Sequence, residues 1–156
     1  MNGFLCAGIG FSLVDLLNNN SKRLNLSPVY VALVAFCFSM TVGVCWEFFE
    51  YAADEIVRTD MQKDTIVSSI SSVKLNEERE NKPVVMKNII ATEIKTSDGQ
   101  TYVVKDGYLD IGINDTMKDL FVNLIGAVVF SIIGYIYVKV RDKNGFASNF
   151  IPQKID

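Results

Sequence analysis

Three carboxylates stand at helical spacing near the middle of the chain: Glu47, Glu50 and Asp54. At 100° per residue, these positions fall within about 60° of one another around a helix. They follow an apolar run, residues 29–46, which contains no charged residue. A run of that length can cross a hydrocarbon core of about 30 Å. The pattern predicts a membrane-spanning helix that ends in an acidic stripe.

A second polar stripe opens the next long apolar run. Asp115, Asp119 and Asn123 are spaced at i, i+4 and i+8, and residues 120–138 contain no charged residue. Because one loop joins the two helices, they are antiparallel, and both stripes arrive at the same face of the membrane. If the stripes face each other, five carboxylates and one amide converge within a few helical turns.

Carboxylates gathered this closely cannot all stay ionised without compensation. Bound cations, protons, or Lys and Arg side chains could each supply it. Because the chain has no histidine and the candidate ligand atoms are all oxygens, a cation bound here would be a hard one. We therefore predict a site for Mg²⁺, Ca²⁺ or Mn²⁺ with these ligands: Glu47, Glu50, Asp54, Asp115, Asp119 and Asn123.

The same residues also allow an interpretation without a metal. Acids in the first turn of a helix are favoured by the helix dipole, and Thr116 with Asp119 fits a capping box. The acids of the first stripe would then be solvated and paired with basic residues, namely Arg58, Lys63 or Lys118. Loop or capping roles are expected for three further acids: Asp60, Asp64 and Asp110.

The composition is that of a membrane protein. Apolar residues make up 49% of the 156 residues, and they are clustered into runs. We predict three transmembrane helices, over residues 1–17, from 28 to 54 or 57, and over 116–138. The first is short, and its glycines suit close helix packing. Ser27 and Pro28 are typical of the N-cap and first position of the second helix.

Residues 58–114 are polar and charged, and they predict a small extramembrane subdomain. Residues 84–94 and 101–104 are rich in β-branched side chains, and Ser97-Asp98-Gly99-Gln100 between them is a turn sequence. This pattern predicts a β-hairpin. The expected fold class is mainly α, with three transmembrane helices and a β-hairpin subdomain between helices two and three. The expected division is 1–58, 59–114, 115–140 and a polar tail, 141–156.

Basic residues predict the orientation. Lys22 and Arg23 follow the first helix, and three basic residues follow the third, namely Lys139, Arg141 and Lys143. The positive-inside rule places both groups in the cytoplasm. The acidic stripes and the hairpin subdomain are then at the outer face of the membrane, in a multi-pass protein. The net charge of −3 argues against nucleic acid as a partner.

Two sequence motifs carry a family resemblance. Trp46-Glu47-Phe48-Phe49-Glu50-Tyr51 and, later, Asp115-Thr116-Met117-Lys118-Asp119 resemble the YjdF-like family of bacterial integral membrane proteins. The piece with Asp119, Asn123 and Gly126-Ala127 is also similar to a helix of VanZ-like proteins. The resemblance implies a polytopic membrane protein and assigns no catalytic residue.

Three functional hypotheses follow. The chain is first interpreted as a membrane scaffold or envelope component whose acids hold a cation at the outer interface. The second hypothesis is a metal-dependent membrane enzyme that acts on a lipid-linked or envelope substrate. The third is a subunit of a cation- or proton-coupled transporter. Membrane lipids are the expected partners, together with further copies of the chain or an additional membrane subunit.

Overall fold

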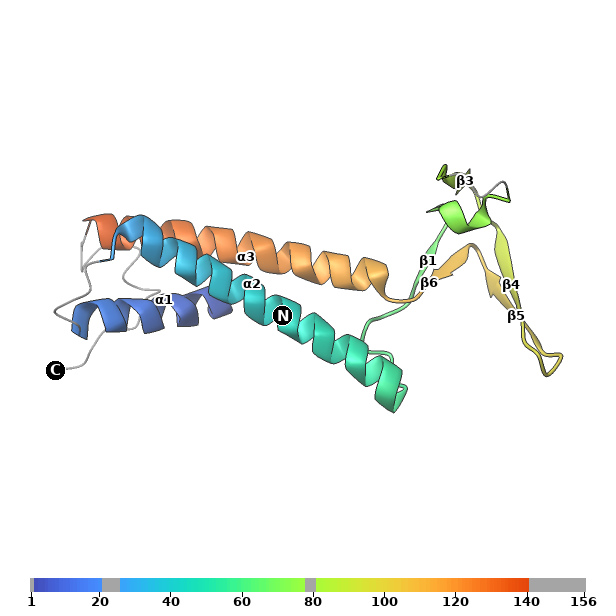
Figure 1. Cartoon of the computed structure of the whole chain (residues 1–156), viewed down its shortest axis with the longest axis horizontal. Helices are drawn as coiled ribbons and strands as arrows, with labels where there is room; N and C mark the ends of the chain where they lie inside the picture. The colour runs from blue at the N-terminus through green and yellow to red at the C-terminus, as the bar shows by residue number, and fades with distance from the viewer. Residues whose placement is uncertain (1, 21–25, 78–80, 141–156) are drawn as a thin grey trace. The chain divides into compact units, whose positions relative to one another are not determined.

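The structure is a computed structural model, and it describes residues 2–20, 26–77 and 81–140. Backbone contacts divide the chain into two units (Figure 1). The helical unit comprises Met1–Val57 and Met117–Asp156, and the strand unit comprises Arg58–Thr116. The predicted polar tail, 141–156, and four of the basic residues used for the orientation lie outside the described residues: Lys22, Arg23, Arg141 and Lys143.

The described residues form the three expected α-helices: α1 (Gly3–Asn20), α2 (Pro28–Val57) and α3 (Ile113–Val140). By length and composition, α2 and α3 are each able to cross a membrane, whereas α1 contributes a shorter apolar stretch. The two longer spans therefore agree with the sequence analysis. The third span, through α1, stays a prediction.

The N-terminal cap of α2 is confirmed. Ser27 Oγ accepts a hydrogen bond from the Tyr30 N–H at 3.3 Å, and the Ser27 carbonyl accepts the Val31 N–H at 3.1 Å. Pro28 occupies the first helical position, where its missing N–H has no helical partner to lose. The Ser27-Pro28 sequence was sufficient to predict this helix start, because the cap bonds join residues only three and four positions apart.

The predicted start of the third helix was wrong by about one turn. The helix begins at Ile113 rather than at Thr116, because the Thr116 N–H already donates to the Gly112 carbonyl at 3.0 Å. The side chain that accepts a free N–H at this end is that of Asp110, which bonds the Asn114 N–H at 2.9 Å. Asp110 was expected to have a loop or capping role, and this contact confirms capping.

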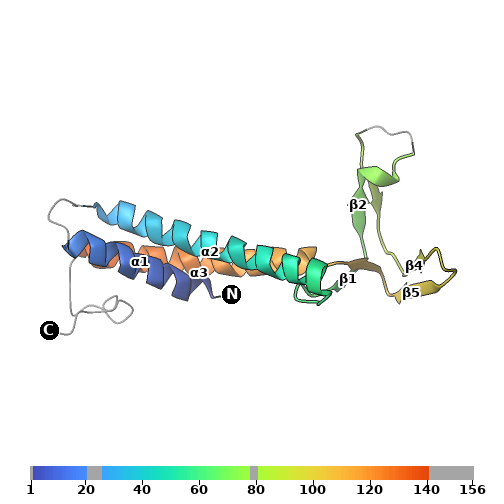
Figure 2. The same cartoon turned by 60° about the horizontal axis from the view of Figure 1, so that its bottom comes forward.

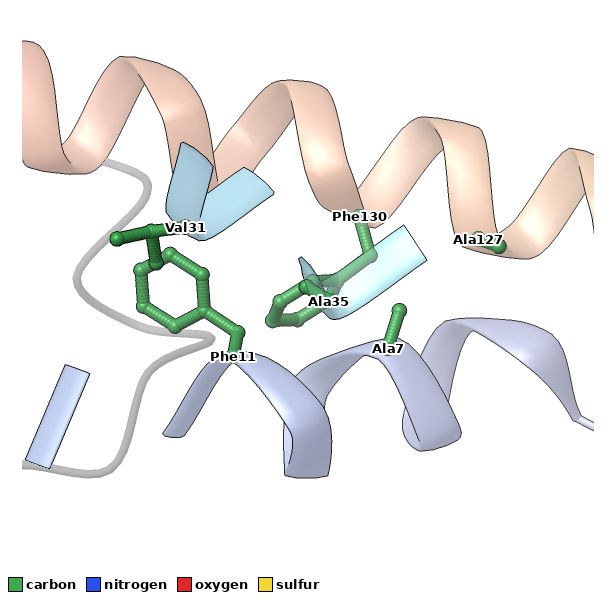
Figure 3. Close-up of a cluster of buried hydrophobic side chains, with 6 residues drawn as sticks. All are labelled: Ala7, Phe11, Val31, Ala35, Ala127 and Phe130. Atoms are coloured by element: carbon green, nitrogen blue, oxygen red, sulfur yellow. The ribbon is translucent and has the colours of Figure 1, made fainter. Parts of the chain in front are cut away.

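Small and aromatic residues form the core of the helical unit. Six apolar residues are fully buried there: Ala7, Phe11, Val31, Ala35, Ala127 and Phe130 (Figure 3). Phe130 lies edge-on to Phe4 and to Phe11, with ring centroids 5.0 and 6.0 Å apart. Edge-to-face pairs of this kind stabilise a core beyond the area that they bury.

The helices approach so closely that several glycines cannot be replaced. A Cβ atom added to Gly126 would lie 2.6 Å from the backbone nitrogen of Phe4. One added to Gly3 would lie 2.2 Å from the carbonyl oxygen of Asn123. These are backbone contacts between α1 and α3, in agreement with the close packing that the glycines of the first helix predicted. Figure 2 shows α1 beside the C-terminal part of α3, in agreement with the contact between Phe11 and Gly134.

The described residues of the strand unit form six short strands in three antiparallel pairs. The strands are β1 (Thr65–Val67), β2 (Ile70–Ser72), β3 (Val84–Met86), β4 (Ala91–Lys95), β5 (Thr101–Lys105) and β6 (Tyr108–Asp110). β1 pairs with β6, β2 with β3, and β4 with β5. A 3₁₀-helix follows β2 at Val73–Leu75.

The predicted hairpin is present, but its first strand is divided. β4 and β5 pair from Ala91–Lys105 to Lys95–Thr101 around the Asp98-Gly99 turn, where Gly99 has a φ of 85°. Residues 84–86, expected in the same strand, pair with β2 instead. The division has a local cause: Asn88 has a φ of 57°, which interrupts an extended chain.

Candidate functional site at the helix contacts

Asn123 is the central polar residue of the helical unit. It lies on α3 and is 1% exposed. Its Nδ2 donates to the Ser39 carbonyl at 3.3 Å and contacts Met40 Sδ at 3.5 Å. A Cβ atom added to Gly43 would lie 2.4 Å from the same nitrogen. Gly43 therefore provides the space in α2 that admits the Asn123 amide.

Ser39 connects this contact to α1. Its Oγ donates to the Gly3 carbonyl at 2.8 Å and lies 3.5 Å from Asn123 Oδ1. Ser39 and Asn123 are both buried. Their side chains therefore form hydrogen bonds with neighbouring helices rather than with water. Hydrogen bonds between helices in an apolar environment hold them at one register. We call the group Gly3, Ser39 and Asn123 the polar node.

Glu47 continues the same face of α2 toward its C-terminus. It is one helical turn beyond Gly43, and it is 7% exposed, with its Oε2 atom enclosed by protein. On α3, Asp119 is one turn before Asn123 and is half-buried. Gly43 contacts Asn123, and the two helices are antiparallel. Glu47 and Asp119 therefore both lie one helical turn beyond this contact, toward the same end of the helix pair; we call the row of these four residues the contact line.

Glu50 and Asp54 lie farther along α2 and are half-buried. Glu50 Oε1 accepts a hydrogen bond from Trp46 Nε1 at 2.7 Å, and the indole also lies beside Phe49, with ring centroids 5.6 Å apart. The Trp46 side chain is 40% exposed. This bond engages Glu50 on an exposed side of the helix, and Figure 1 shows α2 and α3 separating toward the C-terminus of α2.

Asp115 belongs to the strand unit. Its Oδ2 accepts the backbone N–H of Lys63 at 3.1 Å. Beside it, Gln62 Nε2 donates to Thr116 Oγ1 at 2.7 Å. These two contacts tie the first residues of α3 to the segment before β1, so the chain enters and leaves the strand unit at one place.

The six predicted metal ligands therefore have different surroundings. Within the described residues, no group of three or more Asp, Glu or Cys side chains is arranged so that it could hold a metal ion. The amide of Asn123 forms contacts between helices. The carboxylate of Glu50 accepts a hydrogen bond from Trp46, and that of Asp115 accepts one from the Lys63 N–H. The six residues are thus not assembled into a metal site, and the metal hypothesis stays a prediction.

Asp110 is the best-organised carboxylate of the strand unit. It is 8% exposed, and its Oδ2 accepts from Thr65 Oγ1 at 3.1 Å, from the Asn114 N–H at 2.9 Å and from Asn114 Nδ2 at 2.6 Å. Burial alone would raise the pKa of this carboxyl, but the hydrogen bonds from Asn114 and Thr65 outweigh burial and lower the pKa from its usual value. The carboxylate is thus held in its charged form.

Sequence reasoning treated Ser39 only as a small residue. A serine within an apolar run is a weak signal, because its hydroxyl can bond to its own helix as well as to a neighbour. Ser12 on α1 does the former, with Oγ donating to the Gly8 carbonyl at 2.7 Å. Nothing in the spacing alone distinguishes the two serines.

Comparison with known families agrees with a membrane location. Residues 1–72 and 86–140 match the model of a family described as "Predicted membrane protein (DUF2238)". The chain belongs to this family. DUF2238 is the YjdF family, so the first resemblance is supported, whereas the similarity to VanZ-like proteins has no support. The matched residues of this DUF2238 protein include α1, α2 and α3 and leave out residues 73–85.

Searches of the curated proteins and of the solved structures found no match. The family description gives a membrane location and no activity. A function for this DUF2238 protein must therefore be argued from its own residues.

Proposed function

We propose that the chain is a multi-pass protein of the bacterial plasma membrane that acts as a non-catalytic scaffold. In this proposal α1, α2 and α3 all cross the membrane and hold the strand unit at the outer face. The polar node is the observation that carries the proposal. Its two buried polar side chains, Ser39 and Asn123, form hydrogen bonds between helices. Such bonds hold the helices in one arrangement, as a scaffold requires.

The path of the chain into the strand unit supports the same role. The bonds from Lys63 to Asp115 and from Gln62 to Thr116 fasten the two connecting segments to each other. β1 and β6 pair directly after these contacts, from Thr65–Asp110 to Val67–Tyr108. The two ends of the strand unit are therefore joined to each other within that unit, which suits a part that a membrane scaffold presents.

The orientation can be tested by cysteine labelling in whole cells. The three cysteines, Cys6, Cys37 and Cys45, would first be replaced by alanine, and single cysteines placed by Ser97→Cys or Ser27→Cys. Ser97 is in the turn of the β4–β5 hairpin, and Ser27 precedes α2. We expect a membrane-impermeant maleimide to label position 97 in intact cells and position 27 only after permeabilisation. The reverse pattern, or labelling of both, would refute the proposal.

A cation site is the second candidate function, and the burial of Glu47 favours it. A carboxylate that is 7% exposed on an apolar helix is costly unless a proton, a cation or a donor compensates it. Asp119 extends the same contact line, so these two residues are the first ligands to test. The remaining predicted ligands would have to leave their present contacts before they could coordinate the ion; these are Glu50, Asp54, Asp115 and Asn123.

Thermal unfolding in detergent tests the cation site. If Mg²⁺, Ca²⁺ or Mn²⁺ binds, adding the ion should raise the midpoint and EDTA should lower it. Glu47→Gln with Asp119→Asn should abolish this dependence, while Glu55→Gln, on an exposed position of the same helix, should keep it. An ion effect that survives the double substitution would exclude these ligands. The enzyme and transporter hypotheses stay predictions.

A further inference from the structure

The strand unit contains a pocket of about 640 Å³ beside the β1–β6 pair. Its walls come from β1, β2 and the two residues between them, from β6 and from the first residues of α3. All of the lining residues lie between 66 and 114, so the pocket belongs to one unit. Sites for small molecules in proteins have volumes of about 300 to 1,000 Å³. The pocket is large enough for a ligand of one or two rings.

Hydroxyl groups dominate the polar lining. Four of them form no hydrogen bond with any other residue that the structure describes: those of Ser68, Ser69, Ser71 and Tyr108. Elsewhere in the unit, Thr65 donates to Asp110 and Thr92 donates to the Gly107 carbonyl at 2.8 Å. The pocket therefore gathers hydroxyls whose donor and acceptor capacity is available to a ligand.

The charge of the lining limits the ligand class. Asp110 is the charged residue in the lining, which contains neither Lys nor Arg, so an anionic ligand would meet repulsion and no compensating cation. A cationic ligand would have to compete with hydrogen bonds that this carboxylate already accepts. The Oδ2 atom of Asp110 already accepts three hydrogen bonds from Thr65 and Asn114. A neutral ligand fits this electrostatic environment best.

The rest of the lining is apolar. Ile66, Ile70 and Ile113 contribute aliphatic surface, and Tyr108 contributes a ring that is 40% exposed. An aromatic ring with a polar edge can pack against an apolar ligand face while its hydroxyl bonds the rim. A sugar ring has this combination, since its C–H faces are apolar and its edge carries hydroxyls.

We propose that this pocket binds a neutral, hydroxyl-rich ring, that is, an uncharged sugar unit. The hydroxyls of the three serines and of Tyr108 pair with the hydroxyls of the sugar, and the Tyr108 ring packs on its face. Asp110 positions Asn114 and the start of α3 as one wall. The proposal concerns the strand unit alone and does not rest on the scaffold role or on the cation site.

The test compares three sugars that share one ring and differ in charge. The full chain in lipid nanodiscs would be titrated with N-acetylglucosamine, glucosamine and glucose 6-phosphate, and binding followed by ligand-observed NMR. We expect saturable binding of N-acetylglucosamine and at least about tenfold weaker binding of the phosphate ester. No saturable binding of N-acetylglucosamine by the folded protein would overturn the proposal. So would a tenfold preference for glucosamine that disappears in high salt.

Substitutions then locate the site. Ser69→Ala with Ser71→Ala, and separately Tyr108→Phe, should each weaken binding by about fivefold or more, since each removes hydrogen bonds to the ligand. Ser97→Ala removes a hydroxyl outside the pocket and should leave binding unchanged. Circular dichroism melts confirm folding, and Tyr108→Phe keeps the ring if the serine variant is unstable. Binding that is equal in all three variants would place the sugar elsewhere and refute the site.

Discussion

The two units of this protein bury opposite kinds of residue. The helical unit buries alanines, phenylalanines and glycines, and its two buried polar partners, Ser39 and Asn123, bond across helices. Among the described residues of the strand unit, no apolar side chain is buried, whereas Asp110 is only 8% exposed. One unit is held together by backbone approach and the other by turns, strand pairs and a single organised carboxylate.

The difference teaches what each unit can tolerate. Backbone atoms in contact cannot move aside, so an added side chain must separate the helices. Two-stranded pairs with open faces are marginal in water and depend on local hydrogen bonds. Substitutions should therefore have large effects at the helix contacts and smaller, more local effects in the strand unit.

Gly126→Leu should have the largest effect. Its new Cβ would meet the Phe4 backbone nitrogen at 2.6 Å, so α1 must move away from α3. We expect a loss of about 3 kcal/mol or more, at the upper end for overpacking, measured by equilibrium unfolding in mixed micelles. Val129→Leu, at a 45% exposed position of the same helix, should change stability little. Equal stability of the two variants would contradict the contact.

A matched pair of serine substitutions tests the polar node. Ser39→Ala removes the bonds to Gly3 and Asn123 and should cost about 1 kcal/mol. Ser131 Oγ on α3 is enclosed but has no hydrogen-bond partner among the described residues. Ser131→Ala should therefore be neutral or stabilising. Both variants are compared by equilibrium unfolding in mixed micelles. A greater loss of stability for Ser131→Ala than for Ser39→Ala would contradict the role of the Ser39 hydrogen bonds.

Asp110 should make the strand unit sensitive to acid. Because its pKa in the folded protein is lowered, its contribution to stability is present above the unfolded pKa, near 3.8. The contribution is lost as the pH falls through the lower folded pKa. Amide hydrogen exchange of Asn114, compared between pH 7 and pH 3, measures the loss.

The control for this prediction separates Asp110 from other acids. Asp110→Asn should remove the acid-dependent part of the difference, because the amide does not titrate. Asp98 also has a lowered pKa, caused mainly by the Thr96 side-chain hydrogen bond, but it is exposed in a turn. Asp98→Asn should leave the exchange of Asn114 unchanged. An identical response of both variants would show that the effect is not specific to Asp110.

Gly99→Ala should have the smallest effect. Its φ of 85° is unfavourable for alanine, yet nothing lies within 4 Å of the added Cβ. We expect a loss of about 1 kcal/mol from backbone strain alone, confined to the β4–β5 turn and visible as faster exchange of the Thr96 amide, which donates to the Gln100 carbonyl. A loss as large as that of Gly126→Leu would remove the contrast between the units.

The sequence predicted features that depend on near neighbours. The cap at Ser27, the extent of α2 and the Asp98-Gly99 turn are decided within a few residues. It was wrong about the start of α3, because the capping carboxylate, Asp110, is bonded to Thr65 as well as to Asn114. Thr65 is 45 residues away in the chain, so no local pattern could show that contact.

The sequence by itself determined that two long apolar helices carry acids toward a shared end, since spacing fixes which residues share a helical face. It did not determine what those faces meet. The rotation of each helix and the separation of their axes follow from the glycine contacts, and they direct Asn123 to Ser39. Only tertiary packing decides such contacts, because a periodic pattern sets angles around one helix and not distances between two.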